Sequence, residues 1–330
     1  MIKKISLVCF VLFAVMACKN NKEENKVVLD EGAYARSSGR PNTLTIVMDN
    51  RFWEGGIGEV LRKNLAAAVP GLPQEEPMFT IRQMPSTAFT GFANKSRCFL
   101  KIVNNKEVGF KILKNKYARP QIGIVISGRT DEEIINTFRT HKAEIIQTFK
   151  AVEILNKQQL VKTPLVIKGL DTNLGISLSA PKSYRVAKAS KDFYWIRKNI
   201  SHGTMNITAY EVPLNFFKDS LSITQNIISM RDTYGGDNIV VDEGGRFITE
   251  AAYSPYIKEI NMANFDTYET RGTWEVKNKW MAGPFVNYVI KDTKKNRLLV
   301  LEGFVFAPSI NKRDYVFELE AILKTVKFID

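Results

Sequence analysis

The sequence has few of the side chains that most often bind metals or act as nucleophiles. It contains two histidines, His141 and His202, and three cysteines, Cys9, Cys18 and Cys98. The histidines lie far apart and no cysteine adjoins either of them, which disfavours zinc or copper sites and Cys–His pairs. The nucleophile-elbow motif GxSxG does not occur. The sequence therefore predicts no cofactor and no metal, and it favours a non-catalytic protein over an enzyme.

Long apolar runs are also missing. The run at residues 5–14, apolar except for Ser6, is too short for a membrane span of about 20 residues. It follows Lys3 and Lys4 and precedes Val15-Met16-Ala17-Cys18, a pattern typical of a secretory leader that resembles the lipobox of bacterial lipoproteins. We expect residues 1–17 to be removed and Cys18 to carry acyl chains that bind the lipid bilayer. Cys98 then has no disulfide partner, and we expect it in the core.

The segment after Cys18 has no apolar side chain before Val27 and stays polar and rich in turn residues to residue 42. It cannot pack, so residues 18–42 are predicted to form a disordered tether. Lys19, in place of an aspartate, favours the outer membrane by resemblance to enterobacterial sorting. Lys22-Glu23-Glu24 loosely resembles a surface-export signal of Bacteroidota lipoproteins. The periplasmic face of the outer membrane and the cell surface therefore both stay open.

Basic residues outnumber acidic ones, 47 to 34, for a net charge of +13. Such an excess can indicate nucleic-acid binding. Acids are interleaved with the bases, however, and an exported protein seldom meets nucleic acid. We expect no nucleic-acid partner, and the partners that remain are the bilayer, an envelope protein or a glycan.

Two folded domains are expected, at residues 43–165 and 171–330. Each mixes short extended segments with amphipathic helices, and strand often follows strand directly. This pattern predicts an α+β fold with two antiparallel-sheet domains, each covered by amphipathic helices. Expected strands lie near 43–48, 77–84, 97–103, 108–113, 121–127, 174–179, 193–197, 205–210, 247–252, 272–276, 284–291 and 297–306.

Three longer helices have clear sequence signals. Thr130 and Glu133 form a capping box before an apolar stripe that runs to about residue 156. Ser222 and Gln225 have the same spacing in a helix expected at 220–231. A closing helix is expected at about 312–328. The run at 298–301 is apolar throughout and predicts a central strand.

The chain resembles an uncharacterised family of Bacteroidota lipoproteins, domain of unknown function 4837. The residues that carry the resemblance are the lipobox leader, Val47-Met48-Asp49, Trp53-Glu54-Gly55 through Gly58, and the segment from Pro70 to Pro77. The resemblance implies a match over nearly all of the mature chain and brings no activity with it. The second domain is also similar in outline to a PsbP-like fold, with a meandering sheet and a C-terminal helix, which carries no function.

A glycine-rich turn is the first candidate binding site. Gly55, Gly56 and Gly58 precede an expected helix, where backbone amides can hold an anion, although a tight strand-to-helix turn is the better explanation for them. Asp49, Trp53 and Glu54 flank the turn, and an aromatic ring beside two carboxylates could bind a sugar. The same carboxylates supply the alternative function, a cofactor-free hydrolase of envelope carbohydrate.

Two further segments have open interpretations. Leu72 to Pro77 is stiffened by prolines and can either present a partner surface or form a structural crossover. Trp280 is the tryptophan most expected to reach solvent. Taken together, the residues favour a membrane-anchored envelope lipoprotein that works by binding.

Overall fold

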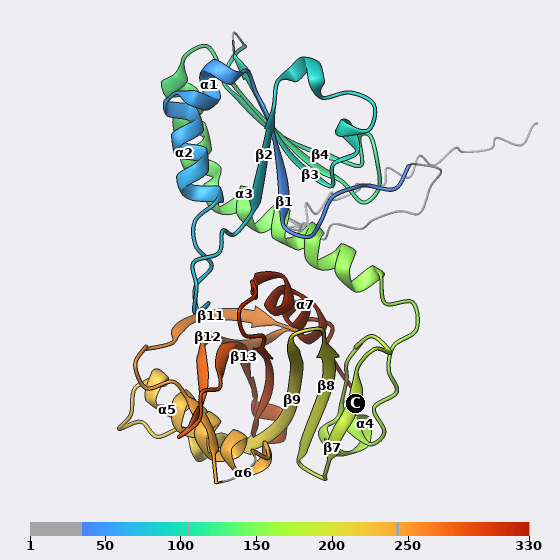
Figure 1. Ribbon diagram of the computed structural model, residues 1–330, viewed down its shortest axis with the longest axis vertical. Helices are drawn as coiled ribbons and strands as arrows, with labels where there is room; N and C mark the ends of the chain where they lie inside the picture. The colour runs from blue at the N-terminus through green and yellow to red at the C-terminus, as the bar shows by residue number, and fades with distance from the viewer. Residues whose placement is uncertain (1–34, 105, 242–243, 330) are drawn as a thin grey trace, which may run out of the picture.

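The computed structural model describes residues 35–104, 106–241 and 244–329. The predicted leader, Cys18 and most of the predicted tether lie outside these residues. Two domains are stacked along the long axis of the molecule, with the long helix α3 (Asp131–Gln159) between them (Figure 1). Within the described ranges, no helix combines the length and apolar character needed to cross a membrane.

The N-terminal domain contains a five-stranded sheet in the order β2-β1-β3-β5-β4. The three pairings among β2, β1, β3 and β5 are parallel, and only β4 runs antiparallel to its neighbour β5. The predicted α+β class is confirmed, but the prediction of an antiparallel sheet is wrong for this domain. The strands are β1 (Thr43–Val47), β2 (Thr80–Met84), β3 (Cys98–Asn104), β4 (Gly109–Lys114) and β5 (Ile122–Gly128).

The connections between these strands explain the parallel pairings. Parallel neighbours need a crossover that returns the chain to the starting end of the sheet. The segment between β1 and β2 holds two helices, α1 (Asn50–Glu54) and α2 (Gly56–Leu65). Between β2 and β3 the chain returns through turns and two short 3₁₀ helices, Ser86–Ala88 and Ala93–Lys95. The sequence showed strands in succession but not the direction in which each connection returns.

Alternate residues of the central strands form two cores. Leu44, Ile46 and Leu100 face α2 and α3, together with the apolar stripe that begins at Ile134. Phe99 and the strand residues around it face the opposite side, where Phe89 and Tyr117 cover them. Cys98 is fully buried in the first core, as predicted.

Helix α3 begins at the predicted capping box. The Thr130 hydroxyl accepts from the Glu133 amide at 3.2 Å, and the Glu133 carboxylate accepts from the Thr130 amide at 3.3 Å. Both bonds satisfy amides that the first turn leaves without helical partners. The helix has 29 residues, so at 1.5 Å per residue it is roughly 43 Å long. The apolar face of α3 packs on the N-terminal sheet, and another face of the same helix is turned towards the C-terminal domain.

The C-terminal domain has an eight-stranded sheet in which every pairing is antiparallel. The predicted outline, a meandering sheet with a C-terminal helix, is confirmed, as is the central position of β14 between β13 and β9. The strands are β7 (Arg185–Ala189), β8 (Phe193–Ile200), β9 (Gly203–Pro213), β10 (Arg246–Thr249), β11 (Tyr256–Met262), β12 (Phe265–Lys277), β13 (Ala282–Asp292) and β14 (Arg297–Phe306).

Helices cover both faces of this sheet. Leu299 and Leu301 face the core beneath α7 (Arg313–Leu323) and α4 (Leu170–Leu174). Leu298 and Val300 face the opposite core, beneath α5 (Ile223–Met230), a π-helical turn (Arg231–Gly235) and α6 (Gly236–Asn238). A sheet buried on both faces explains why β14 is apolar at successive positions. Two short strands, β6 (Ile176–Ser177) and β15 (Lys327–Phe328), pair beside it.

The described part of the predicted tether is attached to the N-terminal domain. The Ser37 amide donates to the Arg119 carbonyl at 3.0 Å, and the Ser38 amide donates to the Lys95 carbonyl at 2.8 Å. The Ser38 carbonyl accepts from the Arg97 amide at 3.0 Å. Residues 35–42 therefore belong to the folded body, because backbone pairing compensates for their lack of apolar side chains.

Candidate functional site

A buried carboxylate from the N-terminal domain caps a helix of the C-terminal domain. Glu76 accepts from the backbone amides of Lys312 at 2.6 Å and Arg313 at 3.1 Å. These amides begin α7, whose own N-cap residue makes no side-chain capping bond. A carboxylate there satisfies two donors that the helix leaves unpaired and favours the positive end of the helix dipole. Glu76 therefore holds the two domains in a defined orientation.

The rest of the Pro70 to Pro77 segment also contacts the C-terminal domain. Gly71 has φ +78°, and a Cβ atom at this position would lie 2.7 Å from the Gly272 nitrogen in β12. Leu72 packs against the C-terminal core, and Arg313 donates to the Pro77 carbonyl at 2.8 Å. The segment is therefore a structural crossover between domains, one of the two interpretations that the sequence left open.

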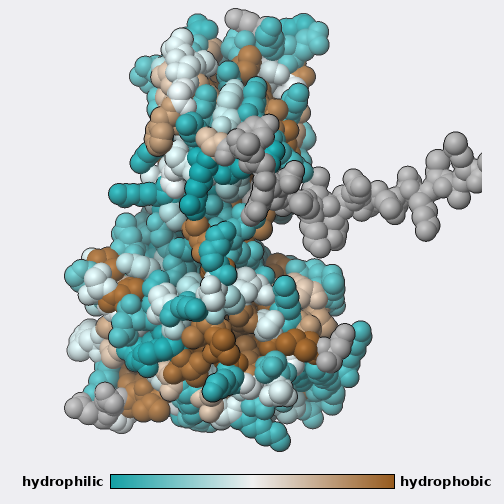
Figure 2. Space-filling view, turned by 90° about the vertical axis from the view of Figure 1, so that its right-hand side faces the viewer, coloured by the Kyte–Doolittle hydropathy of each residue, from teal (hydrophilic) through white to brown (hydrophobic). Residues whose placement is uncertain are grey.

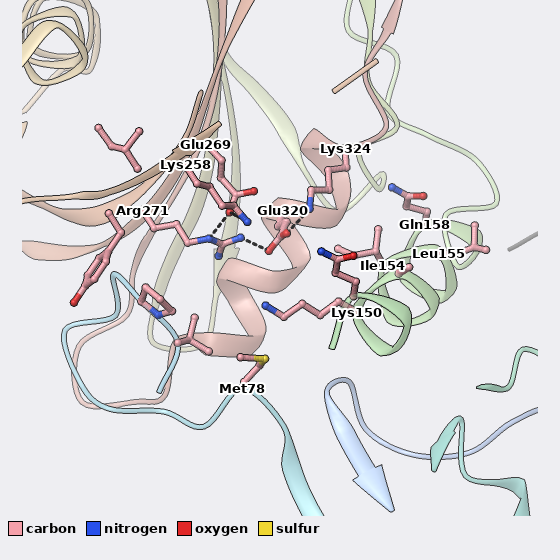
Figure 3. A pocket seen from close by; sticks show the side chains of 16 residues that line it. Met78, Lys150, Ile154, Leu155, Gln158, Lys258, Glu269, Arg271, Glu320 and Lys324 are labelled. Atoms are coloured by element: carbon pink, nitrogen blue, oxygen red, sulfur yellow. Dashed lines mark hydrogen bonds and ion pairs between the residues drawn. The ribbon is translucent and has the colours of Figure 1, made fainter. Parts of the chain in front are cut away.

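A cleft of about 690 Å³ lies between the domains beside this crossover (Figure 3). One wall is a single face of α3, with residues spaced three and four apart. The other walls come from β11, β12 and α7 of the C-terminal domain. The lining residues are Val69, Pro70, Met78, Gln147, Lys150, Ala151, Ile154, Leu155, Gln158, Tyr256, Ile257, Lys258, Glu269, Arg271, Glu320 and Lys324.

Arg271 joins two carboxylates at the centre of the C-terminal wall. Its Nε donates to Glu269 at 2.8 Å and its Nη2 donates to Glu320 at 2.6 Å. Residues two apart on a strand share a face, so Glu269 and Arg271 point the same way from β12. Glu320 reaches them from α7. Arg271 thus ties the sheet to the covering helix within the cleft wall.

Two lysines extend this network. Lys258 lies opposite Glu269 in the β11–β12 register and pairs with it at 3.2 Å. Lys324 follows Glu320 by one helical turn and pairs with it at 2.6 Å. With Lys150, the cleft has four cationic side chains against two carboxylates, a surplus of two positive charges.

Lys150 extends from α3 towards Arg271 and Glu320 (Figure 3). No ion pair or hydrogen bond within the described ranges involves its ammonium group, although the side chain remains accessible to solvent. Desolvation by the surrounding cleft lowers the pKa of Lys150, and Glu320 opposes that shift. An anion bound here would compensate the ammonium for its lost hydration.

The two carboxylates are held in their ionised form. Burial by itself would raise the pKa of Glu269 and of Glu320. Arg271 and the neighbouring lysines together outweigh burial at both sites, and the pKa of each carboxyl is lowered. The cleft therefore presents fixed charges rather than a protonated acid.

The candidate residues from the sequence lie elsewhere. Asp49 precedes α1 and Glu54 is its last residue, and both side chains are exposed. Neither lines the interdomain cleft. Gly55 is the N-cap position of α2, so Gly56 and Gly58 lie inside the helix and the prediction that they precede it is wrong.

Close packing accounts for Gly58 and for the position of Trp53. A Cβ atom at Gly58 would overlap the Trp53 carbonyl, so only glycine allows α1 and α2 to approach this closely. The Arg62 guanidinium lies over the Trp53 ring at 4.5 Å and donates to the Trp53 carbonyl at 2.6 Å. Arg62 therefore covers a face of the Trp53 ring, which had been predicted to bind a sugar.

The cleft residues were missed because their signals are local and common. Glu269-x-Arg271 has strand spacing and Glu320-x₃-Lys324 has helical spacing, but each pair alone indicates only a solvated face. Strand β11, which carries Lys258, was not predicted because its pattern is weakly apolar. Among the described residues, no group of three His, Cys, Asp or Glu side chains is arranged to hold a metal.

Two solved structures share a distant likeness with this chain. The Ran-binding protein Mog1p of Saccharomyces cerevisiae is 10% identical, with a TM-score of 0.33, over 47% of this chain and 91% of that one. LpqN of Mycobacterium tuberculosis, involved in cell envelope biogenesis, is 10% identical, with a TM-score of 0.28, over 47% of this chain and 83% of that one. No curated protein matches the sequence.

Two family models divide the chain between them. Residues 164–325 match the domain of unknown function DUF4837, and residues 37–162 match the domain of unknown function DUF8532. The expected resemblance is confirmed for the C-terminal domain, but it does not extend over the whole mature chain. The N-terminal residues that had carried it, from Val47 to Pro77, lie in the DUF8532 match. The C-terminal domain of this chain therefore matches the DUF4837 model, and the N-terminal domain matches the DUF8532 model.

Proposed function

We propose that the chain is an exported lipoprotein, anchored through Cys18 in the outer membrane, that binds an acidic glycan of the cell envelope. The anchoring part rests on the leader and on Val15-Met16-Ala17-Cys18. The binding part rests on the interdomain cleft. Its central observation is the Lys150 ammonium, which faces the cleft without a carboxylate of its own.

The other walls of the cleft suit a sugar chain. Glu269 and Glu320 keep acceptor lone pairs beyond those used by Arg271, and a carboxylate can accept several hydroxyl donors. The Tyr256 ring is 62% exposed at the edge of the cleft and can pack against the C–H face of a sugar. The positive surplus favours uronic acids or other anionic sugars over neutral ones.

The charge state of the cleft supports binding over hydrolysis. Glycoside hydrolysis needs one protonated carboxyl as the general acid. Arg271 lowers the pKa of both Glu269 and Glu320, so neither serves as that acid near neutral pH. Asp49 and Glu54, the pair named for the hydrolase alternative, stand exposed outside the cleft.

Titration of the full chain with tetragalacturonate by isothermal calorimetry tests the binding part. We expect saturable binding that Lys150→Met weakens about tenfold, because a hydrogen bond between charged groups is lost. Lys142→Met, an exposed substitution on the same helix outside the cleft, should bind like the wild type. Neutral maltotetraose should bind weakly. Equal affinities for both variants, or no binding, would refute the glycan proposal.

Anchoring needs a separate test in the native host. Mass spectrometry of the purified protein should find a diacylglyceryl group on Cys18 at the processed amino terminus. Cys18→Ala should release the protein from the membrane fraction and remove any envelope partner that co-purifies with the anchored form. An unmodified amino terminus would disprove the anchor without bearing on the cleft.

A further inference from the structure

A second cavity, of about 250 Å³, lies wholly within the C-terminal domain. It shares no lining residue with the interdomain cleft. Strands β8, β9, β10, β12 and β14 form its floor, and the segments at 239–241 and 279–281 form its sides. In Figure 2, the largest hydrophobic areas, coloured brown, lie on the C-terminal domain. A cavity separate from the domain interface can take a ligand of its own.

Aromatic rings make the floor of this cavity. Phe247 lies 5.2 Å from Trp274 and 4.9 Å from Phe304, measured between ring centroids. The indole N–H groups are already used, because Trp195 donates to Asn206 at 3.0 Å and Trp274 donates to the Val305 carbonyl at 3.2 Å. The floor therefore offers carbon surface to a ligand and no free indole donor.

The mouth of the cavity is also apolar. Val240 is 74% exposed beside one wall, and Met281 is partly exposed beside another. Trp280, next to Met281, is fully exposed, as the sequence predicted. Exposed apolar side chains that gather around a groove are typical of an interaction site, whereas singly scattered ones are not. Trp in particular is favoured where apolar and aqueous phases meet.

Two cationic side chains, Arg197 and Lys279, are among the residues that line this cavity. Arg197 lines the cavity from β8, and its guanidinium lies 6.0 Å from the centre of the Trp195 ring. Its Nε atom is buried and has no hydrogen-bond partner. In the part of the chain that the structure describes, no carboxylate pairs with Arg197. A buried donor without a partner is costly, and an anionic acceptor would remove that cost.

We propose that this cavity binds one acyl chain that ends in an anionic group. The chain would lie on the aromatic floor, and the carboxylate or phosphate would accept from Arg197. A volume of 250 Å³ holds on the order of eight groups the size of a water molecule, which suits part of an acyl chain rather than a whole lipid. The proposal is independent of the glycan proposed for the interdomain cleft.

Bromine quenching of tryptophan fluorescence tests this proposal, because Trp195 and Trp274 line the cavity. The full chain carries Trp280→Phe to remove the exposed indole and is held in nanodiscs of unbrominated phosphatidylcholine. In one arm a brominated fatty acid is added. In the other arm the discs contain brominated phosphatidylglycerol. We expect saturable quenching in at least one arm, and the arm identifies the source of the acyl chain.

Two arginine variants make the test specific. Arg197→Gln should weaken quenching by the acyl anion about tenfold, since a charge-assisted bond is lost. It should leave quenching by a brominated fatty alcohol unchanged, which separates loss of the charge from loss of the cavity. Arg185→Gln, on the exposed partner position in β7, should behave as the unsubstituted chain. Equal quenching of both variants by the anion, or no quenching in either arm, would overturn the proposal.

Discussion

The interdomain cleft and the aromatic cavity of the C-terminal domain are built in opposite ways. The interdomain cleft takes its walls from both domains and is dominated by an ion-pair network around Arg271. The cavity of the C-terminal domain takes its walls from one sheet and is dominated by aromatic rings. The first exists only while the domains are docked, whereas the second exists whenever the C-terminal sheet is folded. A ligand of the cleft should therefore stabilise the docked arrangement, and a ligand of the aromatic cavity should stabilise one domain.

The largest effect should come from removing the centre of the ion-pair network. Arg271→Gln leaves Glu269 and Glu320 as buried or half-buried carboxylates without their shared cation. Loss of one member of a buried ionic group costs about 3 kcal/mol of unfolding free energy. Urea denaturation followed by circular dichroism measures this change.

Lys258→Gln is the matched control for that substitution. The lysine pairs with the same carboxylate, but its side chain is 62% exposed. A surface ion pair contributes less than about 1 kcal/mol, so the control should lose little. A similar loss in both variants would show that Arg271 does not have the central role assigned to it.

Acid should reveal the same network in the wild-type protein. Glu269 and Glu320 have lowered pKa values in the folded chain, because Arg271 and the neighbouring lysines together outweigh the effect of burial. The stability that they contribute is fully present above the unfolded value of about 4.3 and is lost as the pH falls through the lowered folded values. Unfolding free energies measured from about pH 6 to about pH 2.5 should therefore fall more steeply in the wild type than in Arg271→Gln. Parallel pH profiles for the two proteins would contradict this account. We expect the aromatic cavity to contribute no such pH dependence to the unfolding free energy.

A smaller effect should follow from removing the cap between domains. Glu76→Ala leaves the Lys312 and Arg313 amides without their acceptor and should cost about 1–2 kcal/mol. Hydrogen exchange at the start of α7 should become faster. Glu75→Ala, at the exposed neighbouring position, should change neither quantity.

Glu76→Ala also tests whether the two cavities are independent of each other. Because Glu76 orients the domains, its loss should weaken tetragalacturonate binding in the cleft and leave quenching in the aromatic cavity unchanged. An equal change at both sites would show that they are not independent.

Local signals in the sequence predicted local structure well. The capping boxes at Thr130 and Ser222 both form, and β14 lies at the centre of its sheet. These features depend on residues within a few positions of one another, so their physics can be read from short segments. The parallel pairings of β1 could not be read in this way, because they depend on how the chain returns over about 30 residues.

The candidate site shows the same limit more strongly. Lys150, Arg271 and Glu320 meet only because one face of α3 is docked against β12 and α7. Each of these residues is common in its own segment, and no local pattern in the sequence indicates that α3 packs against β12 and α7. The glycine turn, by contrast, was conspicuous in the sequence for a reason that proved to be packing between α1 and α2.

The Glu76 contact also sets the order in which the molecule can be completed. Its partners, the amides of Lys312 and Arg313, follow it by 236 and 237 positions in the chain. Leu72 likewise can pack only after the core of the C-terminal domain has formed. During synthesis the first sheet can form early, because domains generally fold as units from the amino terminus. The segment from Pro70 to Pro77 stays without these partners until α7, the last helix of the described residues, has been made. Any chain that stops short of α7 would leave Glu76 without the two amides that it caps.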